Sequence, residues 1–167
     1  MISSVVRAVL VDTLVVALLV SMVGCGVQPS GVQDGGVAPT GVAGRTTLFF
    51  VDEDGELRAS ERSTGRLGTV QGAVRLLMAG ASSAESEAGL RTEVPSSTIG
   101  ASVNDAGDSV TIRLPFSGEE IGAAGVDQVI CTVSAVVAGS GRDLDEVRIA
   151  IQRTDGDPIT RPCPALD

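Results

Sequence analysis

The 167-residue sequence contains no histidine, lysine, tryptophan or tyrosine, and it has only three phenylalanines. Without histidine and tyrosine, the side chains that most often act as general bases and proton shuttles are missing. With so few aromatic rings, the chain also offers little surface on which a sugar could stack. Any folded core must therefore be packed from Val, Leu, Ile and Ala, and the composition disfavours an enzyme or a carbohydrate-binding protein.

Positive charge is also scarce, since 12 arginines stand against 21 acidic residues and the formal net charge is −9. No stretch gathers the arginines into a basic stripe. An acidic chain of this kind is repelled by the phosphate backbone of nucleic acids and does not adhere electrostatically to anionic lipid headgroups. We therefore expect no nucleic-acid partner, and attachment to a membrane must come from another source.

The N-terminus carries an apolar run, residues 8–23, that follows Arg7 and ends in the sequence SMVGC at Cys25. A charged lead, a short hydrophobic segment and small residues at a processing point are typical of an export signal. The segment resembles the lipobox of bacterial lipoproteins. That resemblance implies that residues 1–24 are a signal peptide and that the Cys25 thiol receives a diacylglyceryl group.

Two other interpretations of this run stay open, a buried core helix and an uncleaved membrane anchor. Asp12 interrupts the run, so that only residues 13–23 are continuously apolar. A bilayer span needs about 20 apolar residues, and no second apolar run follows. We therefore expect lipidation at Cys25, which would place the protein at the cell membrane, on its extracytoplasmic face.

Residues 26–44 read GVQPSGVQDGGVAPTGVAG, a composition typical of a flexible linker. At about 5–6 Å × √n, such a linker holds its domain some 25 Å from the lipid on average. The sequence thus predicts a lipidated Gly/Pro-rich linker over residues 25–44 and one folded domain over residues 45–167.

Two cysteines, Cys131 and Cys163, remain once Cys25 is assigned to lipid. An even pair in an exported domain most simply forms a disulfide, which would close a loop of about 33 residues and contribute about 3.5–4 kcal/mol. Two free thiols are the alternative. Two cysteines without any histidine make a poor metal-ligand set, so we expect no metal site.

Hydrophobic periodicity divides the domain into strands and helices. Alternating or β-branched apolar residues predict strands, and apolar residues at i, i+3, i+4 and i+7 predict helices. Thr69 and Gly80 are expected to cap the first helix, and Ser82 with Glu85 forms a capping-box pattern. The expected strands are 46–51, 56–62, 99–103, 109–114 and 147–151. The expected helices are 69–79, a short piece that begins at 82, and 126–137, which the sequence GSG at 139–141 terminates. Residues 90–94 are expected to be extended.

This order predicts an α+β fold, a single β-α-β-β-α-β domain in which two helices pack on one face of a small mixed sheet. Motifs that would add chemistry are missing. Leu57 and Ser63 stand where a calcium loop beginning at Asp52 would need glycine and glutamate. The neighbouring carboxylates Glu119 and Glu120 fit a solvated loop better than a glycosidase pair. We expect no catalytic residues and no cofactor.

Several segments together resemble the GerMN domain, also called the sporulation and spore germination domain. They include LFFV at 48–51 with DGEL at 54–57, the helix VQGAVRLLMAG at 70–80, GLRTEVP at 89–95 and the strand VTIRL at 110–114. VICT at 129–132 and the late Cys163 are similar to members carried on lipoproteins. Ala81 departs from the family, which often has proline there.

The resemblance implies a fold akin to ring-building motifs, no enzymatic activity, and a role in binding or assembling other envelope proteins. Spore-envelope complexes and sensor-kinase ectodomains are the types of partner it implies. The alternative from a different class is an accessory protein that binds a cell-wall component or a small ligand, and a hydrolase ranks third.

Overall fold

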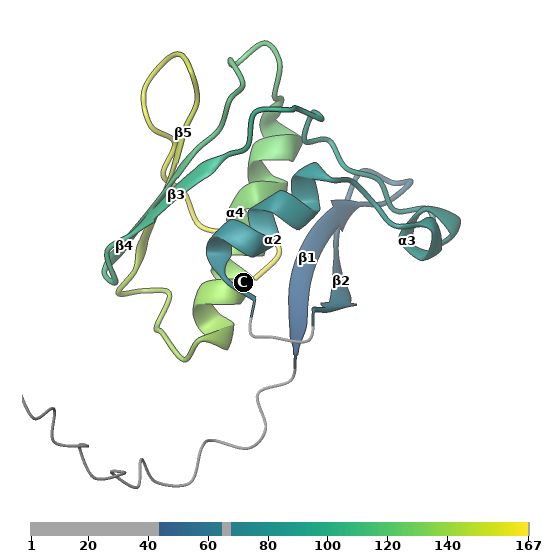
Figure 1. Ribbon diagram of the computed structural model, residues 1–167, viewed down its shortest axis with the longest axis horizontal. Helices are drawn as coiled ribbons and strands as arrows, with labels where there is room; N and C mark the ends of the chain where they lie inside the picture. Colours follow the sequence, from purple (N-terminus) through teal and green to yellow (C-terminus); the bar gives the residue numbers. More distant parts are fainter. Residues whose placement is uncertain (1–43, 65–67, 167) are drawn as a thin grey trace, which may run out of the picture. The chain divides into compact units, whose positions relative to one another are not determined.

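The computed structural model describes residues 44–64 and 68–166, all of which lie in one compact unit of the chain. The predicted signal peptide, the predicted lipidation site Cys25 and most of the predicted linker fall outside these residues. The elements in chain order are β1 (Arg45–Val51), β2 (Leu57–Ser63), α2 (Val70–Met78), α3 (Ser83–Glu87), β3 (Ser102–Asp105), β4 (Ser109–Arg113), α4 (Ala123–Gly139) and β5 (Arg148–Gln152) (Figure 1).

Strands β1 and β2 form the antiparallel hairpin that the sequence predicts, with Arg45 opposite Ser63 and Val51 opposite Leu57. The β-branched and aromatic residues of β1 favour an extended backbone. Gly55 makes the turn with a φ of 87°, a conformation that residues with a Cβ rarely adopt. One strand of this hairpin is buried and the other is largely exposed.

The two helices after the hairpin begin and end where their capping residues predict. The Thr69 hydroxyl accepts the N–H of Gly72 at 3.0 Å at the start of α2, and Gly80 follows its end with a φ of 90°. Ser82 and Glu85 form the predicted capping box of α3. Local hydrogen bonds of this type depend on only four residues, which is why the sequence indicates them clearly.

The strands form two sheets where the sequence predicts one. One sheet is the β1–β2 pair; the other has the order β3-β4-β5, with β3 and β4 antiparallel and β4 and β5 parallel. Helix α4 provides the long connection that parallel strands need. The α+β class and the packing of helices on sheets are confirmed, and the division of the strands is a correction to the expected arrangement.

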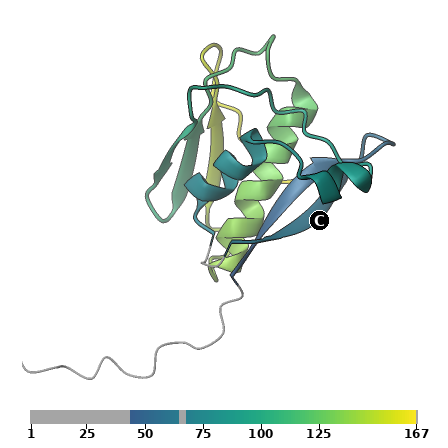
Figure 2. The same cartoon turned by 45° about the vertical axis from the view of Figure 1, so that its right-hand side comes forward.

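Helices α2 and α4 lie between the two sheets and supply much of the core (Figures 1 and 2). The fully buried side chains come from both sheets and both helices, and they are almost all aliphatic, as the composition requires. The largest apolar ones are Phe50, Leu48, Leu77, Ile112, Ile121, Ile130 and Ile151. At about 1.5–3 kcal/mol for each fully buried Leu, Ile or Phe, this cluster stabilises the domain.

Strand β3 spans Ser102–Asp105, so it begins three residues later and ends two residues later than the predicted strand 99–103. Leu114, opposite the place that residue 101 would take, faces β5, where its N–H donates to the carbonyl of Gln152. The next residue, Pro115, has no N–H to offer. The expected strand start, Ile99, therefore lies on a loop with 67% of its surface exposed. The predicted extended segment 90–94 forms only a single bridge, between Arg91 and Val51.

Candidate interaction surface

The disulfide between Cys131 and Cys163 joins the middle of α4 to the C-terminal segment, as the sequence predicts. Cys131 is fully buried, and so are Gln128, Thr132 and Ser134 around it. The sequence places Cys131 at the edge of one apolar stripe, but α4 is covered on most of its surface by two sheets and the C-terminal segment. Most sides of α4 are therefore buried, and its sequence shows only a weak alternation between apolar and polar faces.

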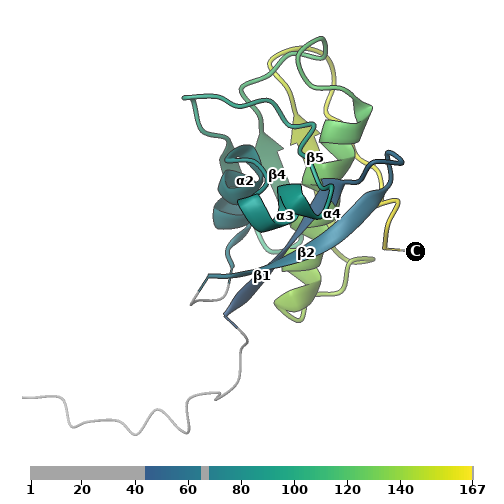
Figure 3. The same ribbon diagram turned by 90° about the vertical axis from the view of Figure 1, so that its right-hand side faces the viewer.

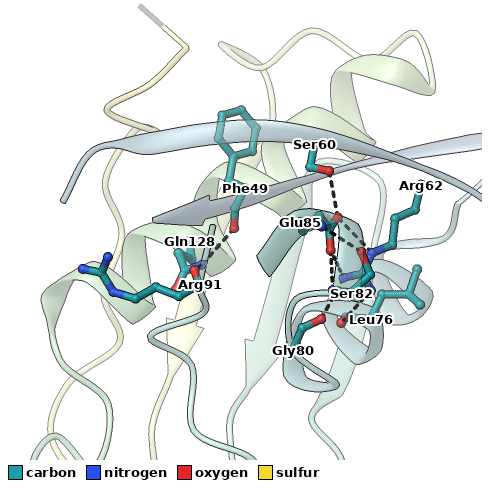
Figure 4. A network of polar contacts seen from close by, with 9 residues as sticks. All are labelled: Phe49, Ser60, Arg62, Leu76, Gly80, Ser82, Glu85, Arg91 and Gln128. Atoms are coloured by element: carbon teal, nitrogen blue, oxygen red, sulfur yellow. Dashed lines mark hydrogen bonds and ion pairs between the residues drawn. The ribbon is translucent and has the colours of Figure 1, made fainter. Parts of the chain in front are cut away.

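A buried carboxylate, Glu85, ties the hairpin to the two short helices (Figure 4). Its oxygens accept hydrogen bonds from Ser60 at 2.7 Å, from the N–H of Ser82 at 2.7 Å and from Arg62. The Arg62 guanidinium also donates to the carbonyls of Leu76 and Gly80 and lies over the ring of Phe50. A cation at the carboxyl end of α2 is favoured by the helix dipole.

Electrostatics keep Glu85 ionised. Burial alone would raise its pKa, but the hydrogen bonds from Arg62, Ser82 and Ser60 outweigh it and lower the pKa to about 2. Every charged group of this cluster thus has an internal partner. The cluster holds β2, α2 and α3 together.

Side chains of α4 cap the inner edge of β1. The N–H of Phe49 donates to Thr132 Oγ1 at 3.0 Å, and the carbonyl of Phe49 accepts Gln128 Nε2 at 3.0 Å. Gln128 Oε1 accepts the N–H of Glu93 at 2.6 Å. Figure 4 shows the amide of Gln128 below the strand, between Phe49 and Arg91. On the side away from β2, the middle of strand β1 therefore meets helix α4, and Val51 at its end exchanges two backbone hydrogen bonds with Arg91.

Strand β3 is capped in the same way by α2. Gln71 Nε2 donates to the carbonyl of Ala101 at 2.9 Å, and Gln71 Oε1 accepts the N–H of Val103 at 3.1 Å. The outer edge of β5 is covered in part, because Ile151 and Ile159 exchange two backbone hydrogen bonds. These amide caps explain why the strands form two sheets. The sequence signal for such a cap is a polar residue among the apolar residues of a helix, such as Gln128 beside Val129.

Strand β2 differs from these, because its outer edge has no cover within the described part of the chain. Residues at even positions face β1, as the bonds Thr64–Gly44 and Asp52–Glu56 show. The N–H and C=O groups of the alternate residues therefore point outward. None of these groups has a partner among residues 44–64 and 68–166. The residues are Leu57, Ala59, Glu61 and Ser63.

The open edge begins beside the turn that joins β1 to β2 (Figure 3). A groove and an acidic turn adjoin it there. The groove has a volume of about 460 Å³ and is lined by Val51, Gly55, Glu56, Leu57, Arg58, Ala124, Asp127, Pro164 and Ala165. Arg58 is held by Asp52 at 2.8 Å, and Arg161 holds Asp127 at 2.8 Å. Among the described residues, Glu53, Asp54 and Glu56 form no ion pair. The edge is thus flanked by free negative charge.

The neighbouring carboxylates Glu119 and Glu120 have different surroundings in the structure. Glu120 accepts the N–H and the hydroxyl of Ser117 at 2.8 and 2.9 Å, and these hydrogen bonds lower its pKa. Glu119 is exposed and forms no ion pair within the described residues. In the same part of the chain, no group of three or more His, Cys, Asp or Glu side chains could hold a metal ion. No described helix is both long and apolar enough to cross a membrane.

Within the described residues, the fold and this surface define a small α+β domain with mixed sheets, packed helices and an open edge on β2. A comparison with protein families matches residues 47–156 to the Germane family, described as sporulation and spore germination. The chain belongs to this family, and the resemblance to the GerMN domain is confirmed.

Among solved structures, the chain is similar to the tandem GerMN domains of the sporulation protein GerM from Bacillus subtilis. The identity is 15% and the TM-score 0.45, over 78% of this chain and 49% of that chain. This chain thus spans about half the length of that structure. No curated protein matches the sequence.

Proposed function

We propose that the protein is a lipid-anchored lipoprotein of the cell envelope whose GerMN domain binds and helps to assemble other envelope proteins, without catalysis. The single observation that carries this proposal is the open edge of β2, since the outer edges of β3 and β5 are at least partly covered by other parts of the chain. The buried Glu85–Arg62 cluster is satisfied internally, whereas four residues of β2 point outward backbone groups that have no partner among the described residues. Exposed strand edges readily accept another chain.

The proposed setting is the extracytoplasmic face of the membrane, in sporulation, spore germination or envelope signalling. Membership of the sporulation and spore germination family supports the first two settings. The lipobox-like segment ending at Cys25 supports the membrane anchor, and the disulfide is compatible with an oxidising compartment.

A zero-length carbodiimide crosslinker tests the proposal in intact cells. The reagent joins carboxylates to amines, and this chain is rich in carboxylates but has no lysine. Two copies therefore have almost no way to crosslink to each other, whereas a partner with lysines does. We expect affinity capture to recover defined envelope proteins. Recovery of glycan alone would instead indicate the cell-wall-binding alternative, and recovery of neither would contradict both.

A further inference from the structure

The exposed edge of β2 is regular enough to accept a further strand. All seven of its residues pair in register with β1, without a bulge. No proline occurs in the strand LRASERS, so each outward residue keeps its N–H. A neighbouring strand would lie about 4.8 Å away and could form hydrogen bonds along this whole edge.

The side chains of an added strand would meet the groove in a defined way. Residues that face each other across two strands point to the same side of the sheet. The residue opposite Leu57 would therefore point its side chain to the face on which Leu57 and Val51 line the groove. Apolar walls from Val51, Leu57 and Pro164 suit an aliphatic stem, and the unpaired carboxylate of Glu56 at the rim suits a positive charge at its end.

Charge selects among possible occupants of this site. The two arginines of β2, Arg58 and Arg62, are already paired with Asp52 and Glu85. Arg45, at the start of β1, is paired with Glu61. The turn beside the edge keeps free carboxylates, and the formal net charge of the chain is −9. A second copy of this acidic chain is disfavoured, and a basic segment is favoured.

We propose that an extended segment of a partner protein adds to β2 as a new strand and places a lysine or arginine side chain in the groove at Leu57. This inference rests on the proposed function, because it names the kind of partner that the interaction domain accepts. Backbone hydrogen bonds supply affinity that is independent of sequence, and the groove with its acidic rim supplies the selection for a basic residue.

Site-specific photocrosslinking in cells that produce the full chain tests this proposal. A photoreactive phenylalanine analogue replaces Glu61, beside the edge, or Ile99, on a distant exposed loop. The crosslinked partner peptide is then identified by mass spectrometry. We expect crosslinks from position 61 to a segment that contains a lysine or arginine about four residues from the crosslink, because Leu57 and Glu61 are four residues apart on β2 and strands rise about 3.3 Å per residue.

Two substitutions separate edge pairing from other contacts. Ala59→Pro removes an outward N–H and leaves the bonds to β1 in place, as prolines on edge strands do. It should lower the crosslink yield from position 61 at least about fivefold, the factor that one net hydrogen bond contributes. Ala59→Thr keeps the N–H and should leave the yield unchanged. If Ala59→Pro unfolds the domain, Glu56→Arg replaces it and should lower the yield several-fold.

The outcomes distinguish this inference from the proposed function. An unchanged yield in a folded Ala59→Pro or Glu56→Arg variant, or an acidic partner segment, would overturn strand addition. Protein crosslinks from position 99 alone would also overturn it, while the interaction function would stand. If neither position crosslinks to any protein, the proposed function fails and this inference fails with it.

Discussion

At the scale of single residues, the polar groups buried in this domain are matched to one another with little excess. Glu85 and Gln128 are the clearest cases, because each accepts or donates several hydrogen bonds from separate elements. Buried polar groups of this kind contribute modestly when satisfied and cost much more when a partner is removed. Their removal should therefore be visible in the stability of the domain.

Stability should depend on the ionisation of Glu85. Its pKa of about 2 lies below the ordinary value of 4.5. The charged carboxylate therefore stabilises the fold fully above about pH 4.5, and this contribution is lost as the pH falls towards 2. The loss from this group is about 3 kcal/mol in the free energy of unfolding. Chemical denaturation at a series of pH values measures it.

The matched controls lie on the same short helix. Glu85→Gln should destabilise the domain at pH 7 by about 3 kcal/mol and should flatten the decline between pH 4.5 and 2. Glu87→Gln, at an exposed position, should change neither quantity. An unaltered decline in the Glu85→Gln variant would show that this carboxylate is not the group that titrates.

Gln128 should be nearly irreplaceable, even by a residue of its own size. Gln128→Glu retains an oxygen for the N–H of Glu93 but loses the donor to the carbonyl of Phe49 and introduces a buried charge. We expect a loss of about 2–4 kcal/mol, measured by chemical denaturation. Gln71→Glu at the half-buried cap of β3 should cost less. Equal losses at both positions would contradict the role assigned to burial.

At the scale of elements, two glycines at the start of helix α4, Gly122 just before it and Gly125 in its first turn, should respond to replacement in opposite directions. Gly122 occupies the N-cap position, where it has no side chain to accept a hydrogen bond from the first turn. A Cβ at this position would meet nothing within 4 Å. Gly122→Asp should therefore stabilise the domain by about 1 kcal/mol. Gly125→Ala should destabilise it, because a Cβ there would lie 2.7 Å from the carbonyl of Glu93. Thermal unfolding of both variants checks the opposite signs.

The disulfide should contribute mainly by linking α4 to the C-terminal segment. Cys131 and Cys163 are 32 residues apart, and closing a loop of this length is worth about 3.5–4 kcal/mol. Reductant, or the pair Cys131→Ala and Cys163→Ala, should lower the free energy of unfolding by about that amount. The double variant should then be insensitive to reductant. A domain equally stable with and without the bond would contradict this assignment.

The elements of this fold were predictable where local signals determine them. Thr69, Gly80, Ser82 and Glu85 mark helix ends through bonds to residues three or four positions away. The division into two sheets was not predictable in the same way. It depends on Gln71 and Gln128, whose amides reach backbone groups about 30 and 79 residues away in the sequence. Such contacts leave no periodic signal in the chain.

The open edge of β2 was predictable only in part. The sequence predicts an exposed second strand after Asp54 and Gly55, and the structure confirms it. Whether such a strand is central or at an edge depends on what packs beside it, which no local pattern reports. The groove depends on residues from β1, β2, α4 and the C-terminal segment, so its position could not be inferred from the sequence.

At the scale of the whole molecule, the negative charge of the chain makes the proposed lipid anchor necessary for attachment to a membrane. The chain has a formal net charge of −9 and no basic stripe, so electrostatic attraction does not bring it to anionic lipids. A lipid on Cys25 would hold it at the membrane regardless of that charge. The acidic domain would then be free to meet a basic partner at close range.

The proposed anchor predicts a simple change of location. Cys25→Ala should release the folded protein from the membrane fraction into the medium, because no acyl chain could be attached. Fractionation and quantification of the two pools measure this. Cys163→Ala, which removes a cysteine from the folded domain instead, should leave the protein in the membrane fraction. Membrane retention of Cys25→Ala would contradict lipidation at this residue.

Carbodiimide crosslinking of the unaltered protein and of Cys25→Ala, in intact cells and at matched protein levels, measures anchoring and binding together. We predict that the unaltered protein captures a specific envelope protein and that Cys25→Ala captures much less of it, although its domain is folded. Capture of no protein by the anchored form, or equal capture by the released form, would contradict a membrane-held interaction domain.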